Sequence, residues 1–191
     1  GEIVNASSEN GMMAINGMSY SARASKFSNA AIVVTCRAAD YGSSGPLAGI
    51  EFQKEIERKA FAAGGSGWMV PAQNLTDFML GRVSSALNEN SFKMGASPVD
   101  MNDIFPGFVG GMLLAAFNKW KIDCPRFVSD QAILLGPETR TSSAVKIVRG
   151  ERYESSNIKN LYPIGEGSGY TGGITSAASD AIRAVEASLA A

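Results

Sequence analysis

A glycine-rich segment between an apparent strand and a helix constrains the fold of this chain most. Residues 165–173 read GEGSGYTGG and follow the short apolar run 161–164, which favours a buried strand. After the glycines, apolar side chains recur at helical spacing, which predicts an amphipathic helix over 174–189. The recurring residues are Ile174, Ala178, Ile182, Val185 and Leu189.

Part of this segment, Gly167 to Gly172, matches the pattern G-x-G-x-x-G that binds dinucleotides in a βαβ unit. Such a unit needs about 30 residues and an acidic residue about 20 positions further on. The sequence ends at Ala191, which leaves room for the helix alone. We therefore do not interpret the pattern as a dinucleotide fingerprint. Small residues still permit close approach of a ligand, and the amides at a helix start attract anions. A helix entry shaped only by glycine turns explains the pattern equally well.

The order of the other expected elements favours the α+β class over regular βαβ alternation. Helices are predicted over 47–63, 73–80 and 106–121, with a loop over 42–46. Strands are predicted over 2–7, 12–16, 29–37, 132–135, 145–148 and 161–164. Asn10-Gly11 separates the first two strands, and this dipeptide is typical of a hairpin.

Composition excludes several classes of function. The chain contains no histidine, which excludes Ser-His-Asp and Cys-His catalysis and histidine-ligated zinc, and we expect no metal site. A net charge of −1 predicts no binding of nucleic acid. The longest apolar stretch, 104–117, is too short to span a bilayer, so no membrane partner is expected. Cys36 and Cys124 lie in no paired motif and are interpreted as buried thiols of a reducing, cytoplasmic compartment.

Four stretches of sequence resemble a family of uncharacterised FAD-dependent dehydrogenases. Residues 161–187, LYPIGEGSGYTGGITSAASDAIRAVEA, resemble the C-terminal flavin segment of that family. Residues 138–147, ETRTSSAVKI, resemble the segment that precedes it. Residues 5–23, NASSENGMMAINGMSYSAR, and residues 46–61, PLAGIEFQKEIERKAF, resemble the middle region. These stretches follow one another in the order that the family has them.

The resemblance implies a two-domain flavoenzyme. Residues 1–130 would form an inserted substrate or cap domain. Residues 131–191 would supply the returning strands and terminal helix of a Rossmann-like FAD-binding domain, whose N-terminal Rossmann half is absent. The start at Gly1 instead of Met also favours a fragment. We expect the longer protein to bind FAD and an unknown small-molecule substrate, and the fragment alone to be inactive and not to retain FAD. The missing Rossmann half is then its expected partner.

The resemblance also implies which residues form the FAD site. Amides of Gly172, Gly173 and Ile174 would meet the pyrimidine edge of the flavin and stabilise negative charge as it is reduced. Gly165 and Glu166 would lie near the pyrophosphate and ribitol. The other candidate cofactor-binding residues are Gly167, Tyr170, Thr141 and Ser142.

Arg140 is the candidate catalytic residue, because a guanidinium can hold a substrate carboxylate through two hydrogen bonds. A salt bridge to Glu138 explains this arginine equally well. Loop packing likewise explains Tyr170 as well as stacking near the flavin does. Asp180 and Arg183 are interpreted as charges on the surface of the last helix.

Two classes of function remain open. The first is a fragment of an FAD-dependent oxidoreductase, in which the flavin carries the hydride chemistry. The second is a stand-alone module that binds a small molecule or anion without redox activity. A complete enzyme with Cys36 or Cys124 as nucleophile is disfavoured because no histidine base is present.

Overall fold

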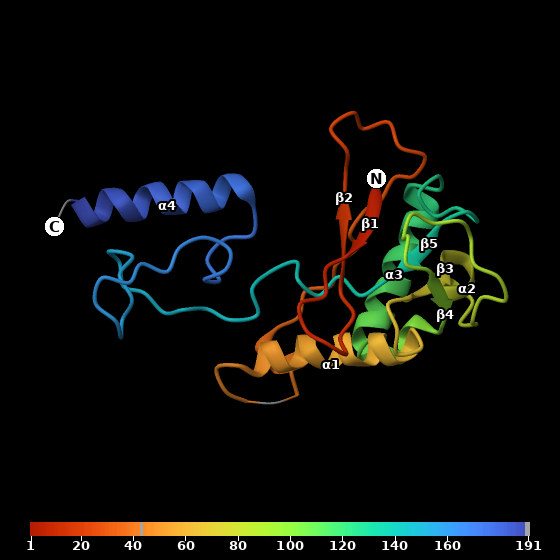
Figure 1. The fold of residues 1–191 in the computed structure, drawn as a ribbon, viewed down its shortest axis with the longest axis horizontal. Helices are drawn as coiled ribbons and strands as arrows, with labels where there is room; N and C mark the ends of the chain where they lie inside the picture. Colours follow the sequence, from red (N-terminus) through yellow and green to blue (C-terminus); the bar gives the residue numbers. More distant parts are fainter. Residues whose placement is uncertain (43, 190–191) are drawn as a thin grey trace. The chain divides into compact units, whose positions relative to one another are not determined.

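The computed structural model describes residues 1–42 and 44–189. Ser43, within the expected loop 42–46, and residues 190–191, at the end of the expected C-terminal segment, lie outside the described residues. The described residues form helices and two small sheets, so the predicted α+β class is confirmed (Figure 1).

The chain divides into two compact units. Unit 1 comprises Gly1–Arg37 and Lys54–Thr139, and unit 2 comprises Ala38–Gln53 and Arg140–Ala191. Helix α1, Ala48–Ala63, matches the helix predicted over 47–63 and contains one of the boundaries between the units. The division into 1–130 and 131–191 that the resemblance implies stays a prediction.

Unit 1 begins with a two-stranded hairpin. Strand β1 (Glu2–Asn5) pairs antiparallel with β2 (Ile15–Met18), so that Glu2 lies opposite Met18 (Figure 1). The connection contains Gly11, whose φ of 74° is a left-handed conformation that favours glycine. The hairpin predicted from Asn10-Gly11 is therefore confirmed, with somewhat different strand bounds.

A three-stranded sheet forms the centre of unit 1. Its middle strand, β3 (Val70–Asn74), is buried along its whole length, runs parallel to β4 (Ala96–Pro98) and antiparallel to β5 (Ile133–Leu135). The helix predicted over 73–80 begins later, as α2 (Leu75–Met79), because Gln73 and Asn74 pair with β5.

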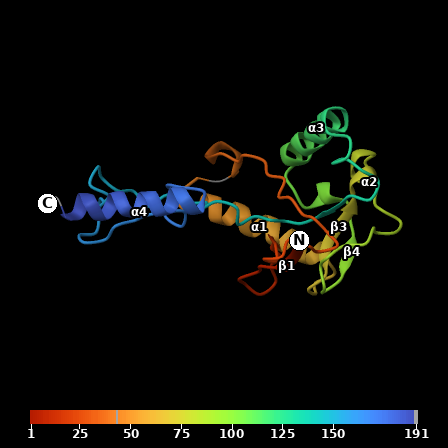
Figure 2. The ribbon, with the colours of Figure 1, turned by 90° about the horizontal axis from the view of Figure 1, so that it is seen from above.

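Helices cover this sheet. Figure 2 shows α2 beside β3, and the Phe78 ring of α2 meets Phe117 of α3 (Gly107–Asp123) edge to face, with ring centres 6.0 Å apart. Two short 3-10 turns are also present, η2 (Met101–Asp103) in unit 1 and η1 (Ala38–Asp40) in unit 2. The buried Gln73 side chain donates to the carbonyl of Arg82 at 2.8 Å and accepts from the Met101 amide at 2.9 Å. It therefore ties two loops to the sheet.

Three predicted strands are wrong. Residues 29–37 form no strand, and Val33 is 60% exposed. Residues 145–148 and 161–164 also form none, because their backbone groups bond to nearby loops instead. The Ile147 amide donates a hydrogen bond to the backbone carbonyl of Ser168 at 3.0 Å. Pro163 has no amide hydrogen with which to pair in a sheet.

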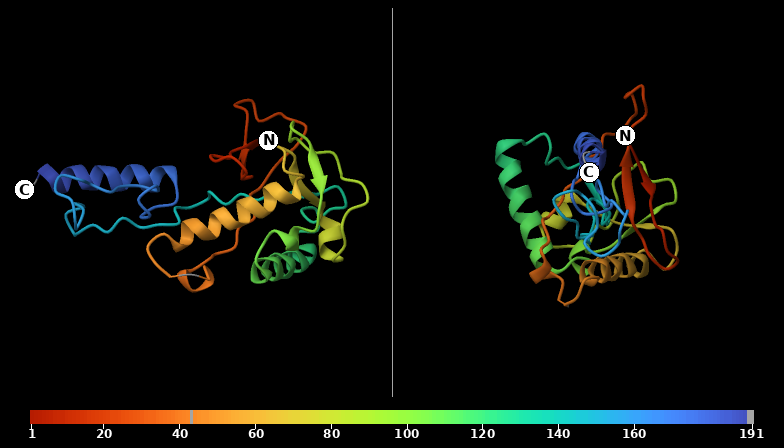
Figure 3. Two further views of the ribbon diagram at one scale, coloured as in Figure 1. Left: turned by 60° about the horizontal axis from the view of Figure 1, so that its bottom comes forward. Right: turned by 90° about the vertical axis from the view of Figure 1, so that its left-hand side faces the viewer.

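Unit 2 ends in α4 (Ile174–Leu189), whose bounds match the predicted helix. Figures 1 and 3 show the segment that precedes α4 running back alongside it. The predicted apolar stripe does not face this segment: Ile174 is 93% exposed and Ile182 is 60% exposed. The buried residues of α4 are Asp180 and Ala184, because small side chains and one carboxylate form the contact face.

Two further expectations concern burial and membrane insertion. Cys124 is exposed and Cys36 is half-buried, so the interpretation of both as buried thiols is wrong. Among the helices of the described ranges, none combines the length and the hydrophobicity that crossing a membrane requires.

Candidate functional site

All the expected site residues belong to unit 2. Arg140, Thr141 and Ser142 are exposed and lie at the start of the long segment before α4. Their neighbour Ser143 contacts the glycine-rich segment, because its hydroxyl donates to the carbonyl of Gly167 at 3.2 Å. A shared site of residues 140–142 and the glycine-rich segment stays a prediction.

The glycine-rich segment closes into a compact loop over residues 165–170. The Tyr170 amide and the Ser168 hydroxyl both donate to the carbonyl of Gly165, at 3.3 and 3.0 Å. At Gly169, φ is 84° and a β-carbon would lie 2.3 Å from the carbonyl oxygen of Val145. Glycine is required here by both conformation and internal packing. The carbonyl of Glu166 accepts from the Gly169 amide at 2.9 Å, and a cofactor contact of its side chain stays a prediction.

Three other glycines have no such internal reason. A β-carbon on Gly167 or Gly172 would meet no atom within 4 Å, and one on Gly173 would meet only the Ser176 hydroxyl at 3.6 Å. None of these three adopts a positive φ. Close approach of an external group to the backbone would explain why side chains are missing here.

Two of these glycines, Gly172 and Gly173, lead directly into the positive end of α4. The first amides of a helix have no intrahelical partner, and the helix dipole adds partial positive charge to them. Ala177 is the residue whose amide first bonds backwards, to the carbonyl of Gly173 at 2.9 Å. The Thr171 hydroxyl oxygen is buried and has no hydrogen-bond partner in the part of the chain that the structure describes. A polar group of this kind usually finds a partner, so it can serve a ligand.

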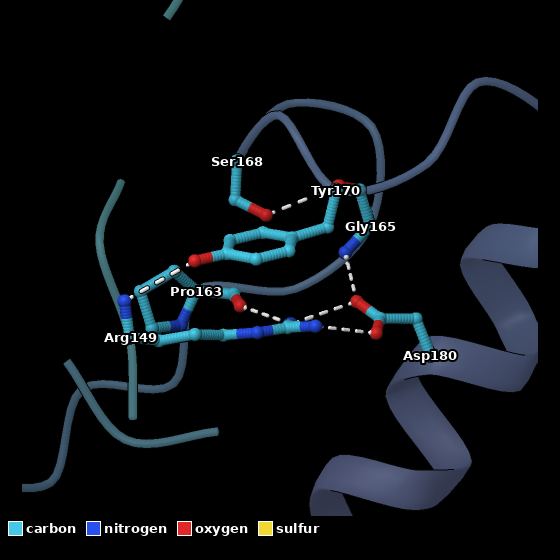
Figure 4. Close-up of polar contacts among 6 residues, drawn as sticks. All are labelled: Arg149, Pro163, Gly165, Ser168, Tyr170 and Asp180. Atoms are coloured by element: carbon cyan, nitrogen blue, oxygen red, sulfur yellow. Dashed lines mark hydrogen bonds and ion pairs between the residues drawn. The ribbon is translucent and has the colours of Figure 1, made fainter. Parts of the chain in front are cut away.

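A buried ion pair holds the glycine loop to α4 (Figure 4). The Arg149 guanidinium donates two hydrogen bonds to the Asp180 carboxylate, at 2.7 and 2.9 Å, and a third to the carbonyl of Pro163 at 2.6 Å. Asp180 also accepts from the Gly165 amide at 2.9 Å. The side chains of Arg149 and Asp180 are only 9% and 11% exposed.

Aromatic rings enclose the same arginine. The Tyr170 ring centre lies 3.6 Å from the guanidinium carbon, and the ring centre of Tyr153 lies 4.4 Å from it. The Tyr170 hydroxyl accepts from the backbone amide of Arg149 at 3.2 Å. The Tyr170 side chain therefore packs on Arg149, and its contact with a flavin stays a prediction.

The electrostatics of this pair keep it charged. Hydrogen bonds from Arg149 and from the Gly165 amide lower the pKa of Asp180 to about 2. The same contact raises the pKa of Arg149 above its ordinary value. At neutral pH the two groups are a charged pair that joins three segments of unit 2.

Sequence reasoning missed this pair. The interpretation of Asp180 as a surface charge is wrong, because the carboxylate is buried against Arg149 and Gly165. One signal was present: Ala177 and Ala184 flank Asp180 at helical spacing, which is typical of a closely packed helix face. Nothing in the sequence identified Arg149 as its partner.

Comparison with known proteins places the chain in a family. The model of the family described as FAD-dependent protein, C-terminal domain-like, matches residues 1–141. An uncharacterised protein from Clostridium beijerinckii is 40% identical over 188 residues, which cover 97% of this chain and 35% of that protein. The chain thus spans about a third of the length of this curated relative. By the extent of the family match, the chain belongs to the FAD-dependent protein, C-terminal domain-like family.

Proposed function

We propose that this chain is a part of an FAD-dependent oxidoreductase, a dehydrogenase, to which it contributes the substrate domain and the flavin-ring side of the FAD site. The observation that carries the proposal is the open backbone of Gly172 and Gly173 at the positive end of α4. Membership of an FAD-dependent family, whose model matches residues 1–141, supports FAD as a ligand of the longer protein. The resemblance of residues 161–187 to a flavin segment is what supports its contact with this backbone.

The residues of this end of α4 fit the polar edge of a flavin. Backbone amides of Gly172, Gly173 and Ile174 would donate hydrogen bonds to it, and the helix dipole would stabilise negative charge there. The buried Thr171 hydroxyl would supply one further polar contact. When bound, FAD supplies the hydride chemistry. Gly165 and Glu166 would lie toward the ribitol and pyrophosphate.

The exposed residues beside Gly167 would face the flavin or the substrate. Thr141 and Ser142 offer hydroxyl groups, and Arg140 offers two parallel donors for a substrate carboxylate. We assign Arg140 the role of binding and orienting an anionic small molecule. The adenine half of FAD would be held by a Rossmann-like half outside this chain, in a cytoplasmic protein.

The absorption spectrum of the full-length protein that contains this chain tests the proposal. We expect flavin absorption bands at about 375 and 450 nm in the purified protein. Gly173→Asp should abolish them, because it places a carboxylate where the negative edge of the flavin would bind. An acidic residue beside a helix N-terminus favours the helix, so the loss would not come from unfolding.

Gly107→Asp is the matched control. Gly107 begins α3, is exposed, and a β-carbon there would meet no atom within 4 Å. This variant makes the same change at another helix N-terminus and should keep the flavin bands. A folded, colourless full-length protein that takes up no added FAD would contradict the proposal and favour an anion-binding module.

A further inference from the structure

We infer that Arg149 and Asp180 are positioning residues for this site: they fix the glycine loop to α4 and thereby set the direction of the amides at residues 172–174. The inference rests on the proposed function, because it concerns the same flavin site. It assigns a role to a buried pair that touches neither the flavin nor the substrate.

The beginning of the glycine loop is bonded to α4 through Asp180. Asp180 lies six residues into α4, about 9 Å along the helix axis from Ile174. Its carboxylate accepts a hydrogen bond from the Gly165 amide at 2.9 Å and two hydrogen bonds from the Arg149 guanidinium. Because Asp180 is part of the helix, the start of the loop moves with α4.

The end of the glycine loop packs on Arg149 through Tyr170. The Tyr170 ring stacks on the Arg149 guanidinium, and the Tyr170 hydroxyl accepts a hydrogen bond from the backbone amide of Arg149. The amino group of Lys146 lies 4.3 Å from the centre of the same Tyr170 ring. Residues 171–173 therefore connect Tyr170, which stacks on Arg149, to α4, which bonds Arg149 through Asp180.

The segment before α4 has little regular secondary structure in its described residues. In the described part of unit 2, residues 140–173 contain no strand beyond an isolated bridge between Arg149 and Ser155. No sheet therefore fixes the backbone. Loop hydrogen bonds, such as that from the Ile147 amide to the carbonyl of Ser168, hold the segment to itself, and the buried side-chain pair attaches it to α4. Binding groups need to be held within about 0.5 Å of their productive geometry, which requires supporting contacts of this kind.

The pair itself is not available to a ligand. Both side chains are about nine-tenths buried, and the guanidinium already contacts a carboxylate, a carbonyl and two rings. Its effect on a flavin must therefore act through the loop. Displacement of binding groups by about 1 Å can weaken their effect up to about 100-fold.

The test compares FAD binding by Asp180→Asn and by a matched variant of the full-length protein, Asp77→Asn. Asp77 pairs with Arg82 at 2.7 Å in unit 1, and its side chain has the same exposed fraction as Asp180, 11%. We would measure the FAD dissociation constant by fluorescence quenching and record the spectrum of the bound flavin. Arg149→Lys serves as a second variant if Asp180→Asn does not fold, because lysine keeps the positive charge but cannot form the bidentate hydrogen bonds to Asp180.

We expect Asp180→Asn or Arg149→Lys to weaken FAD binding about 10- to 100-fold and to shift the flavin bands. Asp77→Asn should leave the dissociation constant and the spectrum unchanged. Equal losses in the Asp180 and Asp77 variants would overturn the inference, because stability alone would then explain them. Wild-type affinity and spectrum in the unit 2 variants would also overturn it, while the proposed function would stand. A folded wild-type protein that binds no FAD would refute both.

Discussion

At the scale of single residues, the glycines of the 165–173 segment fall into two kinds. Gly169 is required by a positive φ and by the carbonyl of Val145, whereas a β-carbon on Gly172 would meet no atom within 4 Å and one on Gly173 only the Ser176 hydroxyl at 3.6 Å. The sequence shows nine residues rich in glycine and cannot separate the two kinds, because both lack a side chain. Contacts within the folded chain separate them, and only the second kind is without an internal packing reason.

Asp180 makes a prediction about pH at the same scale. Its pKa is about 2 in the folded chain, below the ordinary value of 3.8, because Arg149 and the Gly165 amide bond to the ionised form. A lowered pKa in the folded state stabilises the fold above the unfolded pKa and loses that contribution as pH falls. The free energy of unfolding should therefore decrease between about pH 4 and pH 2.

Urea unfolding of this chain across that pH range checks the prediction. Asp180→Asn removes the titrating group, so its stability should fall less steeply between about pH 4 and pH 2 than that of the wild type. Asp77 also has a lowered pKa, because Arg82 donates a hydrogen bond to its carboxylate. Its contribution to the pH dependence of the unfolding free energy remains in both wild type and variant. Parallel pH profiles of wild type and variant would show that Asp180 is not paired as described.

At the scale of elements, α4 carries a prediction about which face is buried. Ala184 is 3% exposed and Ile182 is 60% exposed, although Ile182 belongs to the predicted apolar stripe. Ala184→Leu should destabilise this chain by about 1–3 kcal/mol through overpacking. Ile182→Ser should change the unfolding free energy by less than about 0.5 kcal/mol. Urea titrations measure both, and a reversed order would mean that the apolar stripe is the buried face.

The elements also show what sequence can predict. The helices at 47–63, 106–121 and 174–189 were located correctly because their periodicity and end signals are local. The apolar runs at 29–37 and 145–148 satisfy strand propensity, yet a strand also needs a neighbour to pair with. That neighbour is a property of the whole fold, and residues 145–149 meet the glycine loop instead.

At the scale of the whole molecule, the two units have different means of support. Unit 1 has a buried central strand, β3, with helices packed nearby. In unit 2 the segment before α4 depends on the Arg149–Asp180 pair, and all the candidate site residues lie there. The candidate site could be proposed from sequence because a glycine-rich segment before a helix is a local pattern. Its supporting pair could not, because Arg149 and Asp180 are 31 residues apart and meet only in the fold.

The most direct test of a flavin site is the identity of the ligand in the purified full-length protein. The protein would be denatured, and the released small molecules separated and identified by chromatography with mass spectrometry. We predict about one FAD per chain, since the flavin is the redox group that the proposed site is built to hold. A natively folded protein that releases no flavin, or that releases a different anionic ligand in its place, would contradict the account.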